Sequence, residues 1–195
     1  MNRRLILPIV VFLAGAVILV AAAILTFAPQ RAGQSATASV GGPFSLTTQN
    51  GATMTEKDLL GSPYLVFFGF THCPDVCPTK LFQISEALRA AGPKGEKLKA
   101  LLITVDPERD TVEVMKSYLG SFDERIVGLT GDRAAIDAAI KSFRAYAKKV
   151  PLQGDDYTMD HTALVYLMGK DGNFVAPFNI ERPPAEAAAE WLKYL

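Results

Sequence analysis

Cysteine and histidine are scarce in this sequence, which has two of each among its 195 residues. Two thiols cannot form a framework of several disulfides or a zinc site with four thiolates. The formal net charge is zero, because 20 basic and 20 acidic residues balance. The chain therefore lacks the basic character typical of nucleic-acid-binding proteins. The length allows one domain of ordinary size with an appendage and excludes a large multidomain machine.

Charged residues are missing from one long apolar run, residues 5–28. At about 1.5 Å per residue, a helix of that length crosses a hydrocarbon core of roughly 30 Å. Arg3 and Arg4 precede the run, and basic residues favour the cytoplasmic side of a membrane. We therefore expect residues 1–4 in the cytoplasm, a transmembrane helix over 5–28 in the inner (cytoplasmic) membrane, and the rest in the periplasm or another extracytoplasmic space. The alternative is a cleaved signal peptide, processed near Ala21–Ala23.

Residues 29–42 are rich in small and polar residues and have no apolar period, which predicts a flexible linker. The globular domain then covers residues 43–195. Three of the 20 basic residues, and none of the 20 acidic ones, precede it, so its formal net charge is −3.

Short apolar or alternating segments of this domain predict β-strands. They cover residues 44–48, 52–54, 64–70, 100–105, 126–129, 161–168 and 173–178. The pair Asn50-Gly51 between the first two segments favours a hairpin with a tight type I′ turn. The last two segments are joined by residues 169–172 and predict a second antiparallel hairpin.

Helices are predicted between several of these strands. They begin near 75–78, at 110 or 111, at 132, and at 183 or 184, where proline or a capping side chain favours a first turn. Segments 64–70 and 100–105 flank one such helix, and this strand-helix-strand unit requires parallel pairing. We therefore predict a three-layer α/β domain with a mixed central sheet, of the thioredoxin-like kind.

Cys73 and Cys77 follow the predicted strand 64–70, at the carboxyl end where open α/β sheets bind ligands. Unpaired amides at a helix start stabilise negative charge, so we expect lowered thiol pKa values and two sulfurs available as ligands or nucleophiles. Three residues separate the cysteines, whereas thioredoxin-type dithiol exchange normally uses two. A spacing of one helical turn lets one soft ion bridge both sulfurs. Cu(I) fits best, because it accepts two or three ligands.

A third ligand is available in His161, which begins the predicted strand 161–168 after the polar stretch 155–160. In the predicted fold, the loop before His161 lies at the same edge of the sheet as the thiols. Cys73, Cys77 and His161 could then form a trigonal site of two sulfurs and one nitrogen. Two thiolates and a neutral imidazole around Cu(I) would leave one net negative charge.

Three motifs, GFTHCPDVCPTKL, TVDPERDT and YTMDHTALVYLMGKDG, occur in this order after the apolar run. With them, residues 43–195 resemble the Sco/SenC family of membrane-tethered copper chaperones for cytochrome c oxidase. The resemblance implies a thioredoxin-like fold, copper ligands at Cys73, Cys77 and His161, and delivery of copper to the dinuclear CuA centre of oxidase subunit II. Cu(II) is a further possible state, and other periplasmic copper chaperones or thiol reductants are possible partners. Such a chaperone is not an enzyme in the strict sense.

The second hypothesis is a thiol-disulfide oxidoreductase, in which Cys73 attacks a partner disulfide and Cys77 resolves the mixed intermediate. Some members of the family are thought to reduce the cysteines of the oxidase copper site or to act in redox signalling. Interpreting the cysteines as a purely structural disulfide leaves the histidine unexplained. A peroxidase related to the peroxiredoxins is disfavoured, because this sequence has no counterpart of their active-site threonine, cysteine and arginine. His161 separates the two main hypotheses, because copper binding needs it and simple dithiol exchange does not.

Other polar residues near the motifs have plainer interpretations. His72 is interpreted as a solvent-facing neighbour, with an auxiliary ligand as the alternative. Asp75 and Asp160 fit capping or a solvated surface about as well as tuning of the site or partner contact. Residues 106–110 are interpreted as a turn and helix cap without chemistry, and Met159 as a packing residue.

Overall fold

The computed structural model describes residues 13–17, 19 and 40–195. The chain divides into two units, residues 1–38 and 39–195. In the first unit, residues 13–17 and 19 are helical. Among the described residues, no helix has the length and apolarity that crossing a bilayer requires. Most of the transmembrane helix expected over 5–28, and most of the linker expected over 29–42, lie outside the described residues.

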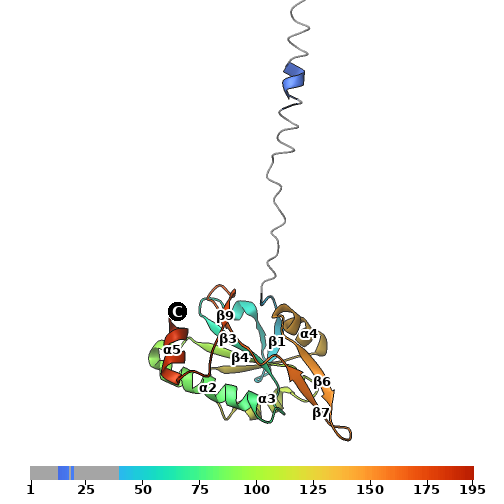
Figure 1. Cartoon of the computed structure of the whole chain (residues 1–195), viewed down its shortest axis with the longest axis vertical. Coiled ribbons are helices and arrows are strands. Elements are labelled where there is room, and N and C mark those ends of the chain that lie inside the picture. Colours follow the sequence, from blue (N-terminus) through green and yellow to red (C-terminus); the bar gives the residue numbers. More distant parts are fainter. Residues whose placement is uncertain (1–12, 18, 20–39) are drawn as a thin grey trace, which may run out of the picture. The chain divides into compact units, whose positions relative to one another are not determined.

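A seven-stranded sheet forms the centre of the second unit (Figure 1). Its strands lie in the order β2-β1-β5-β4-β3-β8-β9. The central strands β3, β4 and β5 pair in parallel and the outer strands pair antiparallel, so the sheet is mixed, as predicted. The bounds are β1 Ser45–Thr48, β2 Thr53–Thr55, β3 Tyr64–Gly69, β4 Lys99–Thr104, β5 Ile126–Thr130, β8 Val165–Met168 and β9 Phe174–Pro177.

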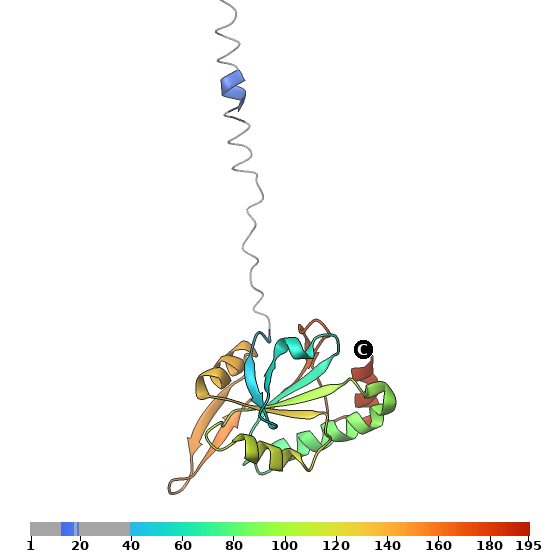
Figure 2. The same cartoon turned by 180° about the vertical axis from the view of Figure 1, so that it is seen from behind.

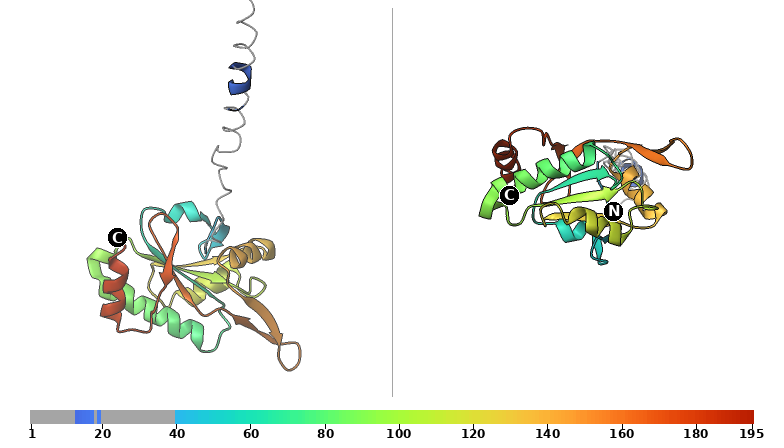
Figure 3. Two further views of the ribbon diagram at one scale, coloured as in Figure 1. Left: turned by 45° about the horizontal axis from the view of Figure 1, so that its top comes forward. Right: turned by 90° about the horizontal axis from the view of Figure 1, so that it is seen from below.

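Helices cover both faces of the sheet, which gives the predicted three layers (Figure 3). Side chains of α2 and α3 pack over Gly69 and Gly128 on one face, whereas Phe143, at the end of α4, packs against Phe68 on the other. α5 packs on α2. The bounds are α2 Val76–Ala91, α3 Val112–Leu119, α4 Arg133–Ser142 and α5 Pro184–Leu192, with short 3-10 helices at Glu56–Leu59 and Gly92–Gly95.

The first hairpin forms where it was predicted, but its turn differs. Thr47 pairs with Thr53, and the amide of Gly51 donates to the carbonyl oxygen of Thr48 over 2.9 Å. Gly51 has φ +80°, whereas Asn50 is not among the residues with positive φ. A type I′ turn requires positive φ at both central residues, so the type I′ prediction is wrong. The connection is a longer loop that uses the freedom of Gly51 alone.

A second, two-stranded sheet was not predicted. β6 (Ala147–Pro151) and β7 (Tyr157–His161) pair antiparallel and project beside the central sheet, in orange in Figure 2. The single strand predicted over residues 161–168 is wrong at its start, because β7 ends at His161 and the next strand, β8, begins only at Val165. The polar stretch conceals an alternation in which Met159 is buried while Asp160 is exposed.

Candidate metal centre

The two cysteines lie where the chain passes from β3 to α2. Cys77 occupies the first turn of α2, whereas Cys73 lies before the helix. The prediction that one helical turn carries both sulfurs is therefore wrong. The amide of Cys77 nevertheless donates to Sγ of Cys73 over 3.4 Å, so the first turn of α2 holds the Cys73 sulfur in place.

Cys77 is fully buried, with a relative exposure of 0%. It packs over Gly69, where an added Cβ would lie 2.9 Å from its sulfur. Burial raises the pKa of the Cys77 thiol and outweighs a hydrogen bond from the Phe70 backbone, which lowers it. The expected lowering is thus wrong for Cys77, because apolar surroundings oppose its charge more strongly than the helix start favours it. A bound cation would supply the missing stabilisation of the thiolate.

β7 places the imidazole of His161 against these thiols. Nε2 lies 3.7 Å from Sγ of Cys77. Nδ1 lies 3.1 Å from the carbonyl oxygen of Thr162, which can only accept, so Nδ1 carries the proton and Nε2 keeps a lone pair. Phe67 and Phe70 contact the imidazole edge-on, and burial lowers the pKa of His161, which favours the neutral ring.

The structure therefore brings all three sequence-predicted ligand residues together. The donor atoms of Cys73, Cys77 and His161 lie within 4.8 Å of one another, and both cysteines are free thiols. Two sulfurs and one nitrogen suit a soft ion of low coordination number, whereas a structural zinc site almost always has four ligands. The donor set fits Cu(I).

A buried carboxylate, Asp110, holds the loop that leads to Cys73. It accepts hydrogen bonds from the Thr71 amide at 3.1 Å, the Thr71 hydroxyl at 2.6 Å and the Thr104 hydroxyl at 2.5 Å. Burial raises the pKa of Asp110, while these hydrogen bonds oppose the rise. Of the two residues predicted to cap α3, Thr111 is the cap. Asp110 is not, and it supports the metal loop instead.

A network of polar side chains connects the β6–β7 hairpin, which carries His161, to the rest of the domain. Oη of Tyr157 donates to Asp106 over 2.9 Å, and Arg109 donates to the carbonyl oxygen of Tyr157 over 3.0 Å. The Arg109 guanidinium also bonds to Asp106 and lies 3.7 Å from the centre of the Tyr157 ring. Sequence reasoning missed this role, although charged residues between a buried strand and a helix cap were a signal.

The remaining singled-out residues lie outside the group of three donors. His72, Asp75 and Asp160 are exposed. Asp75 stands at the N-cap position of α2 without a side-chain capping bond, and Asp160 lies opposite Lys148 in the hairpin. Met159 is 8% exposed and belongs to the core, which confirms its interpretation as a packing residue.

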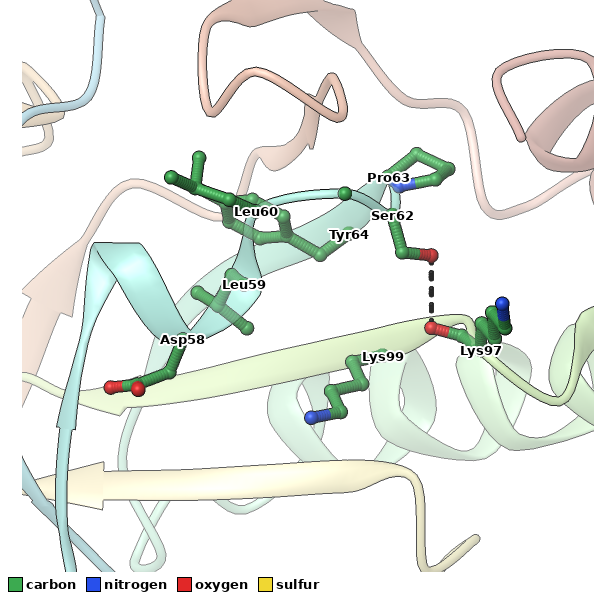
Figure 4. A pocket seen from close by; sticks show the side chains of 9 residues that line it. Asp58, Leu59, Leu60, Ser62, Pro63, Tyr64, Lys97 and Lys99 are labelled. Atoms are coloured by element: carbon green, nitrogen blue, oxygen red, sulfur yellow. Dashed lines mark hydrogen bonds between the residues drawn. The ribbon is translucent and has the colours of Figure 1, made fainter.

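A pocket of about 390 Å³ lies at the opposite end of β3 from the thiols (Figure 4). Tyr64 begins β3 there, and the lining combines apolar residues with two basic residues, Lys97 and Lys99, and the acidic Asp58. Ser62 donates to the carbonyl oxygen of Lys97 over 3.0 Å. The pocket contains none of the three donors, so its volume does not mark the metal centre.

Comparison with known sequences gives one family. The sequence model described as SCO1/SenC matches residues 32–195. The mouse "Protein SCO1 homolog, mitochondrial" is 44% identical over 152 residues, which are 76% of this chain and 54% of that protein. The chain spans about half the length of the mouse and human relatives it matches.

Solved structures agree with this result. The copper-bound structure of ScoI from Bradyrhizobium japonicum is 60% identical, with a TM-score of 0.79 over 80% of this chain and 100% of that chain. BsSco, described as having a disulfide switch and as a member of the Sco family of cytochrome c oxidase assembly proteins, is 25% identical, with a TM-score of 0.64 over 80% of this chain and 92% of its own. These likenesses confirm the predicted thioredoxin-like fold.

Proposed function

The chain belongs to the SCO1/SenC family, and we propose that it is a copper chaperone rather than an enzyme. Its cargo is Cu(I), bound by Cys73, Cys77 and His161, and its acceptor is the CuA centre of cytochrome c oxidase subunit II. The convergence of three donor atoms within 4.8 Å carries the proposal. The copper-bound relative and the description of BsSco as an oxidase assembly protein support it.

Exposure of the donors suggests an order of transfer. Cys77 is fully buried, whereas Cys73 is partly exposed. Low-coordinate Cu(I) leaves an open approach for a thiolate or thioether of the acceptor, and that approach is on the side of Cys73. Donor contacts are then exchanged one at a time, so copper never leaves as a free ion.

Thiol-disulfide exchange is the second candidate function, favoured by the two free thiols and by the disulfide switch described for BsSco. The Cys73 thiolate attacks a partner disulfide and displaces one partner sulfur as a thiolate. The Cys77 thiolate then attacks Cys73, which forms an intramolecular disulfide and releases the second partner thiolate. The partner is reduced and the chaperone oxidised. Burial, which raises the pKa of Cys77, disfavours the second step and places this function behind copper binding.

We place the domain on the extracytoplasmic side of the inner membrane, anchored through residues 5–28. The uncharged run and the preceding Arg3 and Arg4 support this placement. Thiols in such a compartment are exposed to oxidation, so a thiol reductant is a required partner. Other periplasmic copper chaperones are suitable donors of the metal.

The test uses the full chain, purified in detergent with its thiols reduced and loaded with Cu(I). X-ray absorption is expected to show two sulfurs and one nitrogen around copper, and Cys73→Ser and Cys77→Ser are each expected to remove one sulfur. Mixed with apo subunit II and then separated from it, the loaded chain should pass its copper to that protein. A copper shell without both sulfurs would refute the ligand assignment. Loss of acceptor disulfides without copper transfer would favour the second function.

A further inference from the structure

The outer side of β6 is an open edge of the two-stranded sheet. The Thr162 amide donates to the carbonyl oxygen of Tyr146 over 3.0 Å, and every second residue pair of an antiparallel ladder makes such bonds. Ala147 and Lys149 fall between the bonded pairs, so their amides and carbonyls point away from β7. No group among the described residues bonds to them. β6 therefore offers backbone donors and acceptors to a further strand.

A groove of about 580 Å³ lies beside β6, between the hairpin and α4 (Figure 1). Ile140 of α4, Ala147 of β6 and Met159 of β7 give it an apolar lining, and Lys141 and Lys149 add positive charge. An extended segment that pairs with the open edge would bury this apolar lining and satisfy the backbone groups of β6. Main-chain bonds of this kind provide affinity, and the side chains that fill the groove provide specificity.

The charge of this region is opposite to that of the whole domain. Residues 138–154 contain four basic residues and no acidic one, whereas the domain has a formal net charge of −3. None of the four forms a salt bridge with a described residue. Glu108 and Asp137 also line the groove, but both are paired with Arg133. The unpaired charge of the groove is therefore positive. The four basic residues are Lys141, Arg144, Lys148 and Lys149.

We propose that this groove binds an extended, acidic segment of the copper acceptor, which adds to β6 as a third strand. Carboxylates of that segment contact Lys141 and Lys149, and its alternate apolar side chains pack on Ile140. His161 pairs with Ala147 across the hairpin, so an acceptor docked on β6 lies beside the strand that carries a copper donor. The inference rests on the proposed function and specifies how the acceptor is recognised.

A second copy of this chain is a less favourable occupant of the groove. Pairing of two β6 edges would bring Lys149 of each copy close to the basic residues of the other copy. Like charges on adjacent strands are destabilising, whereas an acidic segment avoids this repulsion. The charge of the groove thus favours the acceptor over self-association.

The first test measures amide hydrogen exchange in the reduced full chain, in detergent, with and without an excess of apo subunit II. Exchange at Ala147 and Lys149 should slow by about tenfold or more when subunit II is added, because new ladder bonds then protect these amides. Without subunit II, both amides should exchange as exposed groups at every concentration of the chain.

The second test measures the rate of Cu(I) transfer to apo subunit II by loaded variants of the full chain. Ala147→Pro removes an amide that does not bond to β7, so the hairpin keeps its own ladder. Lys141→Glu reverses an exposed charge on α4 and leaves β6 unchanged. Each should slow transfer by about tenfold. The matched control is Lys116→Glu, an equal charge reversal at an exposed position of α3, which should transfer copper like wild type.

The Cu(I) affinity of every variant, measured with a chromophoric chelator, should stay within about twofold of wild type, because none removes a donor. Unchanged exchange at Ala147 and Lys149 in the presence of subunit II would overturn the inference, as would transfer by Lys141→Glu at the wild-type rate. Lys141→Glu decides the question if Ala147→Pro does not fold. Protection that grows with the concentration of the chain alone would assign the edge to a second copy and also refute the proposal. If subunit II protects β6 but receives no copper, the docking inference stands and the proposed function fails.

Discussion

Sγ of Cys77 lies 3.7 Å from Nε2 of His161, although 84 positions separate the two residues in the chain. α2 positions the thiol and β7 positions the imidazole, so the two donors meet only in the folded protein. The unfolded chain has no preformed copper site, so copper binds the folded protein and should stabilise it against unfolding.

His161→Ala should weaken Cu(I) binding by about 100-fold or more, because it removes the nitrogen and leaves two sulfurs. Competition with a chromophoric chelator measures this loss. Lys148→Ala, an exposed change on the neighbouring strand, is the control and should bind like wild type. Unchanged affinity in His161→Ala would remove the histidine from the site.

Gly69→Ala should displace the sulfur of Cys77, which packs over Gly69. The added Cβ would lie 2.9 Å from Sγ of Cys77 and 3.1 Å from Cδ1 of Leu102, both in the packed core. We expect a loss of about 1–3 kcal/mol in the free energy of unfolding, together with weaker Cu(I) binding as the sulfur shifts. Urea denaturation and chelator competition measure the two effects. Gly120→Ala, whose Cβ would come no closer than 3.4 Å to another atom, should show neither.

Tyr157→Phe should loosen the β6–β7 hairpin. It removes the 2.9 Å hydrogen bond to Asp106 and leaves the ring in place. The expected cost is about 1 kcal/mol, with faster amide hydrogen exchange in the hairpin and a few-fold loss of Cu(I) affinity as His161 becomes less well held. Tyr146→Phe is the control, because Tyr146 is 50% exposed. Equal exchange rates in both variants would mean that the Tyr157 hydroxyl does not hold the hairpin.

The parts of the fold that could be predicted depend on burial patterns. β3 and β4 are covered on both faces, so they appear as continuous apolar runs, and Asp132 and Thr111 cap helices through bonds to nearby amides. β7 could not be found in this way. Its acidic and polar residues resemble a loop, and only one of its residues, Met159, is buried, so the sequence carries no clear period of two.

The candidate donors were predicted, but their surroundings were not. Asp110 bonds to Thr71 across 39 positions, and such a polar contact leaves no period in the sequence. The thiol pKa of Cys77 was misjudged for a related reason. The start of α2 could be inferred from Pro78. The burial of the Cys77 thiol, in contrast, depends on how it packs against Gly69 and its neighbours.

The affinity for Cu(I) should rise with pH. Burial raises the pKa of Cys77, so at neutral pH the apo protein holds this residue as a thiol, and copper binding must release its proton. For each proton released, affinity increases about tenfold per pH unit until the thiol pKa is reached. Chelator competition between pH 6.5 and 9, corrected for the chelator's own titration, measures the slope. A flat profile would mean that the Cys77 thiolate already exists in the apo protein.

The stability of the apo protein should vary with pH in two opposite directions. Burial raises the pKa of Cys77, so its contribution is complete below the pKa of an unfolded thiol, about 8.5, and is lost as pH rises above that value. Burial lowers the pKa of His161, so its contribution is present above the ordinary value of 6.5 and is lost as pH falls through the lowered value. Urea titrations of wild type should therefore show weakening on both sides of this window. Cys77→Ala should remove the onset of the alkaline decline just above about pH 8.5, where the buried tyrosines, whose pKa values burial also raises, do not yet titrate. His161→Ala should remove the onset of the acidic decline just below about pH 6.5 and leave the later loss caused by carboxylates such as Asp123, whose pKa its hydrogen bonds to Arg125 lower. An onset unaffected by its own variant would assign it to another group.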